Sequence, residues 1–344
     1  RRPSPRRPAT SPPPPTPTDD TSDTSPTDTP TGPTDGTTST EGCDNVLLGE
    51  AIVDDARSLQ ALRGVCEITT RLEIYAGPTH VDPLSELQTV GSTLRVIQST
   101  LAELDGLSAL TSIGFDGLLL DDNAHLVHID GLSALTATGR FYIVDNAVLA
   151  DLNGLASVTE VDGNVSIRDN PSLVHLDGLA ALSTIAGELH VSSNDALVDL
   201  DGLSGVREVG GRISIFGHPV LGDIDGLAGI THVGEYVQVS ANDTLRNVDG
   251  LSGLRAIGER VEIRWNDELI HIDGLAGVTW VGGDLVITNN TSLNHVNGLA
   301  GITAVDGDVI IENNEDVCTS EVEAWLEGVS VGGVPKRVHS HMSI

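Results

Sequence analysis

The hydrophobic residues of this chain recur in a fixed order, and residues 189–211 show one full cycle. Leu189 and Val191 flank the polar His190, which is the alternation of a β-strand that buries one face. After Asn194, apolar residues come at intervals of three until a pair of glycines turns the chain: Leu197, Leu200, Leu203, Val206 and Val209. The pattern predicts a strand followed by tight corners, with seven inward apolar side chains in each cycle.

The tripeptide Asp-Gly-Leu or Asn-Gly-Leu marks the same point of each cycle. Its nine copies begin at Asp105, Asp130, Asn153, Asp177, Asp201, Asp225, Asp249, Asp273 and Asn297, so the spacing is constant after the first two intervals. A period in the low twenties is typical of a solenoid in which each repeat forms one coil. We therefore expect a mainly β protein, a right-handed β-solenoid of about nine 24-residue coils over residues 94–316 with short helical caps.

A column of asparagines precedes these tripeptides by seven residues. An inward Asn offers two donors and an acceptor to backbone groups that lose their ladder partners where the strand ends. We expect a stacked structural ladder of Asn123, Asn146, Asn170, Asn194, Asn242, Asn266, Asn290 and Asn314, in which His218 takes one position. At the next corner, the Asp of the tripeptide is expected to bond its own turn, and the Gly to supply unusual backbone angles.

The outward strand positions vary from coil to coil, whereas the inward positions hardly change. Solenoids bind through their extended strand surface, and exposed aromatic residues and arginines are typical interface anchors. Trp265 also offers a ring on which a sugar can stack. The candidate ligand-binding residues are Tyr142, Arg168, His190, Phe216, Gln238, Glu262, Arg264 and Trp265. The alternative is that these side chains vary without function on a solvated face.

Residues 1–41 differ in composition from the rest of the chain. They hold 11 of the 16 prolines, and most of the others are Thr, Ser or Asp. Such a segment cannot bury apolar surface, so we expect a disordered stalk over residues 1–41 that holds a domain away from a wall or membrane. An unselected terminus is the alternative. Residues 42–93 are expected to form an N-terminal cap and the first strand, and residues 317–344 a C-terminal helical cap and tail.

The segments that flank the repeats have characteristic sequences. Cys43 is followed by a helical pattern over residues 55–62, and Cys66 by a strand pattern that ends at Tyr75. Residues 313–325 read Asn-Asn-Glu-Asp-Val-Cys-Thr-Ser-Glu-Val-Glu-Ala-Trp, in which Ser320 and Glu323 form a capping-box pattern. These ends resemble receptor L domains of the insulin-receptor and EGF-receptor ectodomains, which are related to leucine-rich repeats. Residues 43–330 also resemble repeat-containing bacterial surface lipoproteins and fungal wall-anchored proteins.

The resemblance implies an extracellular recognition or wall-associated module and a disulfide between Cys43 and Cys66 that closes the N-terminal cap. Such a bond places the protein in an oxidising compartment. Cys318 is then either a buried thiol or the partner of a cysteine outside this sequence. Receptor L domains have fewer coils, so their ligand-contact residues do not map onto this chain.

The net charge of the chain limits the classes of molecule that it can bind. The net charge is −32, of which residues 1–41 contribute only −2, and such an acidic surface repels nucleic acid and anionic lipid head groups. No apolar run is long enough to span a membrane. The expected location is extracellular or on a cell surface, in bacteria the outer surface or the periplasm. A lipid or wall anchor upstream of residue 1 remains open.

The polar columns contain no recognisable catalytic motif. Acid–base catalysis needs two carboxylates in unequal environments. The carboxylates here recur at the same position of each coil, so their environments are expected to be alike. His271 and His295 could share a metal with Asp273, but their column continues along the whole array as a solvated edge would. We therefore expect no catalytic residues, no metal and no cofactor. The expected function is non-catalytic recognition or adhesion with an extracellular protein or glycan ligand. A passive envelope component and a β-helix polysaccharide-processing enzyme are the alternatives.

Overall fold

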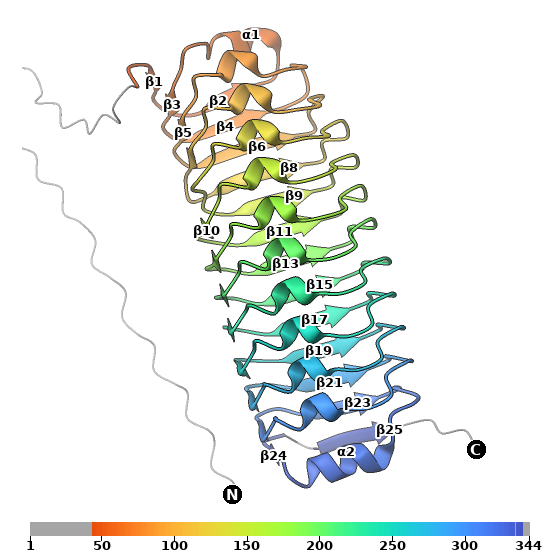
Figure 1. The fold of residues 1–344 in the computed structure, drawn as a ribbon. Coiled ribbons are helices and arrows are strands. Elements are labelled where there is room, and N and C mark those ends of the chain that lie inside the picture. The colour runs from red at the N-terminus through yellow and green to blue at the C-terminus, as the bar shows by residue number, and fades with distance from the viewer. Residues whose placement is uncertain (1–42, 334, 340–344) are drawn as a thin grey trace, which may run out of the picture. The chain divides into compact units, whose positions relative to one another are not determined.

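The computed structural model describes residues 43–333 and 335–339, with side chains for residues 43–333. These residues form a β-solenoid whose coils stack along one axis (Figure 1). The stalk expected over residues 1–41 lies outside the described residues, as does the end of the tail, residues 340–344.

One parallel sheet runs the length of the solenoid. Each coil contributes one strand, and each strand pairs in parallel with its counterpart in the next coil. Within the described residues its strands are β2 (Ala51–Val53), β4 (Arg71–Ile74), β6 (Thr93–Ile97), β8 (Gly117–Asp121), β9 (Phe141–Val144), β11 (Val165–Arg168), β13 (Leu189–Ser192), β15 (Ile213–Phe216), β17 (Val237–Ser240), β19 (Val261–Arg264), β21 (Leu285–Thr288), β23 (Val309–Glu312) and β25 (Pro335–His339). We call it the main sheet.

Two-residue strands line a second side of the coils and form two shorter parallel sheets. The first contains β1 (Val46–Leu47), β3 (Glu67–Ile68), β5 (Thr89–Val90) and β7 (Ser112–Ile113). The second contains β10 (Glu160–Val161), β12 (Thr184–Ile185), β14 (Glu208–Val209), β16 (His232–Val233), β18 (Ala256–Ile257), β20 (Trp280–Val281), β22 (Ala304–Val305) and β24 (Ser330–Val331). Between them, isolated bridges at Ala137 and Thr138 replace a strand, in the part of the array where the tripeptide spacing is not yet constant. The irregular coil exposes Phe115 by 76%.

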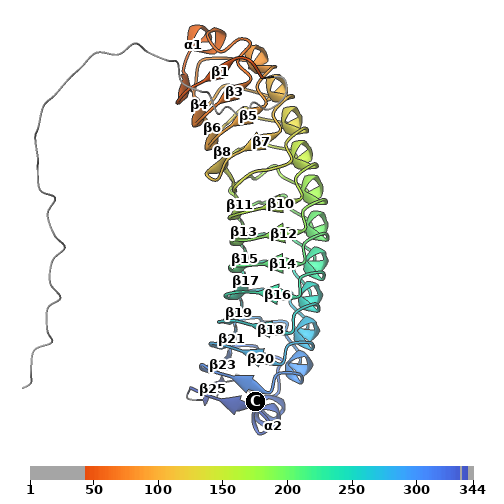
Figure 2. The same ribbon diagram turned by 90° about the vertical axis from the view of Figure 1, so that its left-hand side faces the viewer.

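A column of short 3-10 turns runs along the side of the coils opposite the main sheet (Figure 2). The described residues contain ten: η1 (Asp82–Leu84), η2 (Asp105–Leu107), η3 (Asp130–Leu132), η4 (Asn153–Leu155), η5 (Asp177–Leu179), η6 (Asp201–Leu203), η7 (Asp225–Leu227), η8 (Asp249–Leu251), η9 (Asp273–Leu275) and η10 (Asn297–Leu299). Nine coincide with the tripeptides. The tenth, η1, reads Asp-Pro-Leu, so the tripeptide count misses it.

The expected role of the tripeptide is wrong in two respects. Gly202, at the centre of η6, does not have a positive φ. It is required because a Cβ there would collide with the backbone carbonyl of Leu176 in the preceding coil. The side chain that bonds the turn belongs to the residue two positions earlier, since the N–H of Asp201 donates to Oδ1 of Asp199 at 3.1 Å. In η1 Pro83 stands where the other turns have glycine, and the element that η1 contacts in the preceding coil is the helix Ala56–Gln60 rather than a 3-10 turn.

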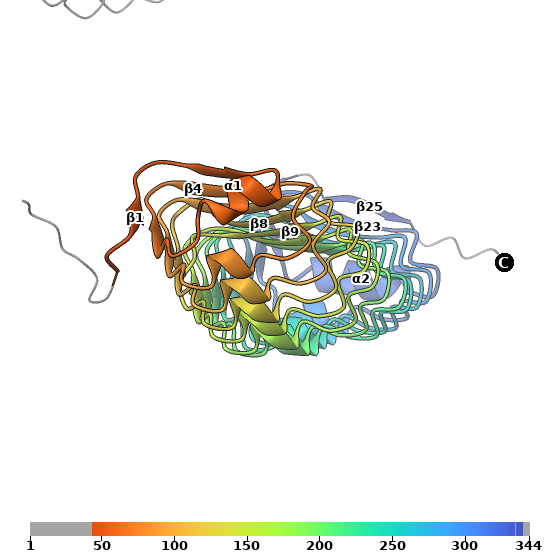
Figure 3. The ribbon, with the colours of Figure 1, turned by 90° about the horizontal axis from the view of Figure 1, so that it is seen from above.

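The interior contains stacked columns of aliphatic side chains, the buried Phe141 and one polar column, and each coil is slightly displaced from the one before it when seen from above (Figure 3). The polar column is the asparagine ladder, whose side chains are buried throughout. Nδ2 of Asn242 donates to the carbonyl of Ile215 at 3.2 Å and to Oδ1 of Asn266 at 3.3 Å. The backbone N–H of Asn242 also donates to that Oδ1, at 3.1 Å. Each amide thus joins its own coil to both neighbours.

The residue before each ladder position has a left-handed backbone. Its φ lies between 52° and 58° in Asp122, Asp145, Asp169, Ser193, Ala241, Trp265, Asn289 and Asn313, and it is 76° in Gly217. Gln98, one coil before the first ladder residue, has the same conformation with a φ of 49°. Non-glycine residues adopt this conformation at a cost of roughly 1–2 kcal/mol, which Asp and Asn tolerate best. The sequence pattern did not predict this corner, which turns every coil inward.

Helices close both ends of the solenoid. At α1 (Ala56–Gln60), Asp55 and Ser58 form a reciprocal capping box. The capping box expected at Ser320 and Glu323 is wrong, because α2 (Thr319–Leu326) begins after Cys318 and has no side-chain cap. Within the described residues no helix is both long and apolar enough to cross a membrane.

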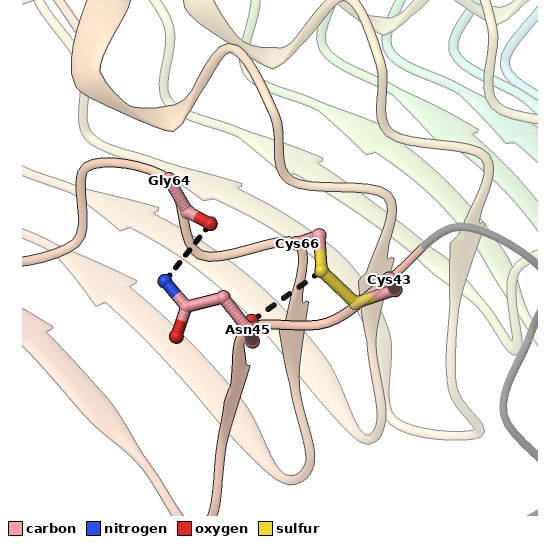
Figure 4. The surroundings of a disulfide bond; sticks show 4 residues. All are labelled: Cys43, Asn45, Gly64 and Cys66. Atoms are coloured by element: carbon pink, nitrogen blue, oxygen red, sulfur yellow. Dashed lines mark hydrogen bonds between the residues drawn. A yellow bond between two sulfur atoms is a disulfide. The ribbon is translucent and has the colours of Figure 1, made fainter.

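The disulfide implied by the resemblance is present. Cys43 is bonded to Cys66, and beside them Nδ2 of Asn45 donates to the carbonyl of Gly64 at 2.9 Å (Figure 4). The backbone N–H of Cys66 donates to the carbonyl of Asn45 at 3.0 Å. The segment before β1 is therefore tied to the coil beneath it. Cys318 is a free, exposed thiol rather than a buried one.

Candidate functional site

The outward surface of the main sheet, which we call the strand face, carries three columns of side chains. The central and last columns follow the register expected from the sequence, for example Tyr142–Ser166–His190 and Val144–Arg168–Ser192. The first column, formed by the residue before each strand, was missed. It contains Arg140, Asn164, Glu188, Arg212, Tyr236 and Arg260, whose carbonyls accept hydrogen bonds from the preceding coil. Extending the strand alternation by two residues toward the N-terminus would have identified it.

Arginine is concentrated on the strand face. The sequence has twelve arginines between residues 43 and 333, and seven lie in a main-sheet strand or directly before one: Arg71, Arg95, Arg140, Arg168, Arg212, Arg260 and Arg264. Because the protein is strongly acidic as a whole, this face differs electrostatically from the rest of the surface.

Four of the seven guanidinium groups of the strand face stack on aromatic rings. The Arg264 guanidinium lies 4.2 Å from the centre of the Trp265 ring, and that of Arg140 lies 5.3 Å from the Tyr142 ring. The Tyr236 ring is contacted by Arg212 at 5.5 Å and by Arg260 at 5.7 Å. Such cation–π contacts hold both partners in fixed orientations, which reduces the entropy lost when a ligand binds.

Glu262 does not have the exposed position that the sequence pattern suggested. Its side chain is 2% exposed, because Nη2 of Arg260 lies 2.6 Å from one carboxylate oxygen and Arg264 pairs with the other. The two arginines cover the carboxylate, so a ligand would contact them rather than Glu262. Ser166, opposite Tyr142 and His190, is buried by its neighbours in the same way.

The other predicted residues fall into two groups. Tyr142, Arg168 and His190 lie on β9, β11 and β13, and the Phe216 ring on β15 contacts the His190 ring edge-on at 5.4 Å. Farther along, the side-chain amide of Gln238 bonds Ser214 and Ser240 at 3.1 Å each. Phe216 and Arg264 share a column with Ser240 between them, which separates them by roughly 10 Å. Trp265 lies just beyond β19, at the left-handed corner, and is 48% exposed.

Two hollows adjoin each other on the strand face, and Tyr142 lines both. The larger, of about 670 Å³, is lined by Arg71, Ser92, Thr93, Arg95, Asp116, Leu119, Arg140 and Tyr142. The smaller, of about 230 Å³, is lined by Tyr142, Asn164, Ser166, Arg168, Glu188, His190 and Arg212. Three of the residues predicted from the sequence therefore line one small hollow.

His190 and Glu73, both in the central column of the strand face, have shifted pKa values. Burial, and then the positive charges of Arg168 and Arg212, lower the pKa of His190 to about 4, so its imidazole is neutral at pH 7. Burial alone would raise the pKa of Glu73, but hydrogen bonds from Tyr75 and Arg95 and the charges of Arg95 and Arg71 lower it below its ordinary value. The negative charge of the Glu73 carboxylate is therefore balanced by the neighbouring Arg71 and Arg95.

The histidines considered as metal ligands lie on a different edge of the coils. The rings of His271 and His295 are stacked with centres 6.0 Å apart, and Asp273 lies 3.7 and 3.8 Å from their Nδ1 atoms. Among residues 43–333, no group of three or more His, Cys, Asp or Glu side chains is arranged to hold a metal ion. These histidines and Asp273 are neighbours in a column that repeats along the coils.

Comparison with known proteins does not place the chain in a family. No model of a known protein family matches it, and no curated protein matches it either. The structure shows the repeat solenoid. The comparisons give no support to the resemblance to receptor L domains and leucine-rich repeats.

Proposed function

We propose that this protein is a non-catalytic recognition or adhesion module that acts outside the cell and binds a protein or glycan ligand through its strand face. One observation carries the proposal. An acidic protein places seven of the twelve arginines of residues 43–333 on one face, and four of the seven stack on Tyr142, Tyr236 and Trp265. Arginine and aromatic residues are the side chains most enriched among the residues that dominate binding energy at interfaces.

The variation among coils supports the same face. The inward apolar columns and the asparagine ladder repeat almost unchanged, because each coil must pack on the next. The outward columns differ from coil to coil, so they can distinguish one ligand from another.

The disulfide supports an extracellular or periplasmic location. Structural disulfides persist in oxidising compartments and are rare in the cytosol of ordinary cells. The bond between Cys43 and Cys66 lies at the edge of the N-terminal cap, where it ties the first strand to the cap.

A carbohydrate-processing enzyme is the less favoured candidate. Burial, then neighbouring Asp199 and Asp223, raise the pKa of Asp201, and the same kind of environment raises that of Asp225. These groups belong to a column that repeats along the coils, so they lack the unequal environments that an acid–base pair needs.

Ligand arrays test the proposal against a passive envelope component. The full chain, labelled at Cys318, is applied to arrays of glycans and of extracellular proteins, and each signal is titrated. Saturable binding to a defined ligand is expected. Uniformly weak, non-saturating signals on both arrays would favour the passive role, and release of reducing sugar from the bound glycan would favour an enzyme.

A further inference from the structure

The smaller hollow of the strand face combines charge, aromatic surface and polar groups in the volume of about one sugar ring. Tyr142 and His190 supply ring surface, and Arg168 and Arg212 supply positive charge. The side chains of Asn164 and Glu188 line the same hollow and add hydrogen-bonding groups. The hollow therefore offers one site where an apolar ring face and polar substituents can be bound together.

The arginines of this hollow are only partly satisfied. Within the described residues, the buried Nε atoms of Arg168 and Arg212 have no hydrogen-bond partner. Glu188 pairs with Nη2 of Arg212 at 3.0 Å, which balances one of the two charges. Two guanidinium groups and one carboxylate leave the hollow with an excess of one positive charge, because His190 is neutral. Elsewhere on the face Arg71, Arg95, Arg260 and Arg264 pair with buried glutamates, although the Nε atoms of Arg71 and Arg264 also lack a hydrogen bond to any described residue.

A buried donor without a partner is energetically costly, and a charged donor more so. A guanidinium group binds a carboxylate through two parallel hydrogen bonds, which makes it the usual partner for that group. Since those Nε atoms are closed to solvent, it is the excess positive charge of the lining residues that favours an anion at the guanidinium group of Arg168.

We infer that this hollow binds a hexuronic acid residue of an acidic saccharide, with the carboxylate on Arg168 and a ring face against Tyr142. The assignment deepens the proposed recognition function and rests on it. The carboxylate of Glu188 can accept hydrogen bonds from the sugar hydroxyls, and the side-chain amide of Asn164 can donate to them.

The position of the hollow favours a saccharide over an acidic peptide. A peptide binds tightly to a sheet by adding a strand to an open edge. The hollow lies over β9, β11 and β13, which are interior strands whose backbone groups pair with neighbouring strands on both sides. A peptide backbone would find no ladder partner there, whereas a sugar ring needs only side chains.

Calorimetry on the full chain tests the assignment with a trimer of galacturonic acid as the probe. Its neutral homologue galactotriose and triglutamate are the comparison ligands. We expect Arg168→Gln to weaken binding of the acidic trimer at least about tenfold, as loss of a charge-assisted pair does. The matched control is Arg246→Gln, which removes the same charge from a side chain that is 71% exposed and away from the strand face. Binding to this variant should stay within about twofold of wild type.

Other outcomes overturn the assignment. Equal affinity for galactotriose would exclude the carboxylate contact, and binding of triglutamate without the acidic trimer would exclude the saccharide. Unchanged affinity in a folded Arg168→Gln variant would exclude this hollow. If the acidic trimer does not bind but an array ligand binds and is lost with Phe216→Ser and Tyr236→Ser, the hexuronate assignment fails while the recognition function stands.

Discussion

Nε2 of His218 donates a hydrogen bond to the carbonyl of Val191, 3.2 Å away, and so makes the contact that an asparagine Nδ2 makes in the other coils. Nδ1 of the same ring lies 3.4 Å from the backbone N–H of Asn194, where a ladder Oδ1 would accept, and 3.3 Å from the carbonyl of Asn194. The neutral imidazole with its proton on Nε2 thus reproduces the backbone contacts of the ladder. A protonated ring could donate from Nδ1 to the carbonyl of Asn194, but it would leave the N–H of Asn194 without its acceptor.

The His218 ring makes stability depend on pH. Burial lowers the pKa of His218 below its ordinary value of 6.5, against the effect of its contacts with Asn194 and Val191. Because the folded-state pKa is the lower one, the stabilisation is complete above about pH 6.5 and is lost as the pH falls toward the folded-state pKa. Denaturant unfolding between pH 4.5 and 7.5 should show wild type losing more stability on acidification than His218→Asn. Parallel pH profiles for the two proteins would contradict the assignment.

Loss of a ladder asparagine should destabilise the fold. Asn242→Ala removes the donors to Ile215 and Asn266 and the acceptor that serves the N–H of His218. We expect the free energy of unfolding to fall by about 1–3 kcal/mol, because buried backbone groups lose their partners. Asn294→Ala, at an exposed position, is the control and should change it by less than about 0.5 kcal/mol. Equal stability of the two variants would show that the ladder contributes nothing.

The left-handed corner predicts opposite effects of one substitution at two positions. Ala241 has a φ of 52°, so Ala241→Gly should relieve roughly 1–2 kcal/mol of backbone cost and remain stabilising after the entropy of glycine is subtracted. Ala228 has an ordinary φ of −62°, and Ala228→Gly should destabilise by about 0.5–1 kcal/mol. Thermal unfolding of both variants measures the difference. Destabilisation of the same size in both would contradict the strain at the corner.

Two of the three cysteines should form a disulfide, and the third should be a free thiol. Peptide mapping without reduction should pair Cys43 with Cys66, and native alkylation should modify Cys318 alone. Replacing Cys43 and Cys66 by Ser opens a loop of 23 residues, which should lower the free energy of unfolding by about 3 kcal/mol. A bond from Cys318 to Cys66 would be inconsistent with this cap.

Repetition explains why so much of the fold could be predicted from the sequence. The glycine of each tripeptide marks the place where one coil touches the next, and the Asn column marks the buried corner. The first turn was missed because it has Pro83 where the other turns have glycine, so it does not match the tripeptide. The left-handed corner was missed because residues as different as Asp122, Ala241 and Trp265 occupy it.

The candidate site was less predictable because it depends on which outward side chains cover one another. The spacing placed Tyr142, Arg168 and His190 on one face, but spacing alone does not show that they line a common hollow. Nor does it show that Arg260 and Arg264 bury Glu262 between them. Those contacts depend on side-chain length and direction across neighbouring coils, which the pattern of a single coil does not contain.

The dissociation constant of a strand-face variant tests the central claim most directly. Phe216→Ser with Tyr236→Ser removes two rings from the strand face without uncovering a buried glutamate. Val174→Ser with Val198→Ser is the control, since it removes two exposed apolar side chains that lie outside the main sheet. For the ligand found on the arrays, the first variant should bind at least about thirtyfold more weakly, or ~2 kcal/mol, while the control binds as wild type does. A folded Phe216→Ser, Tyr236→Ser variant with wild-type affinity would contradict the assignment of binding to this face.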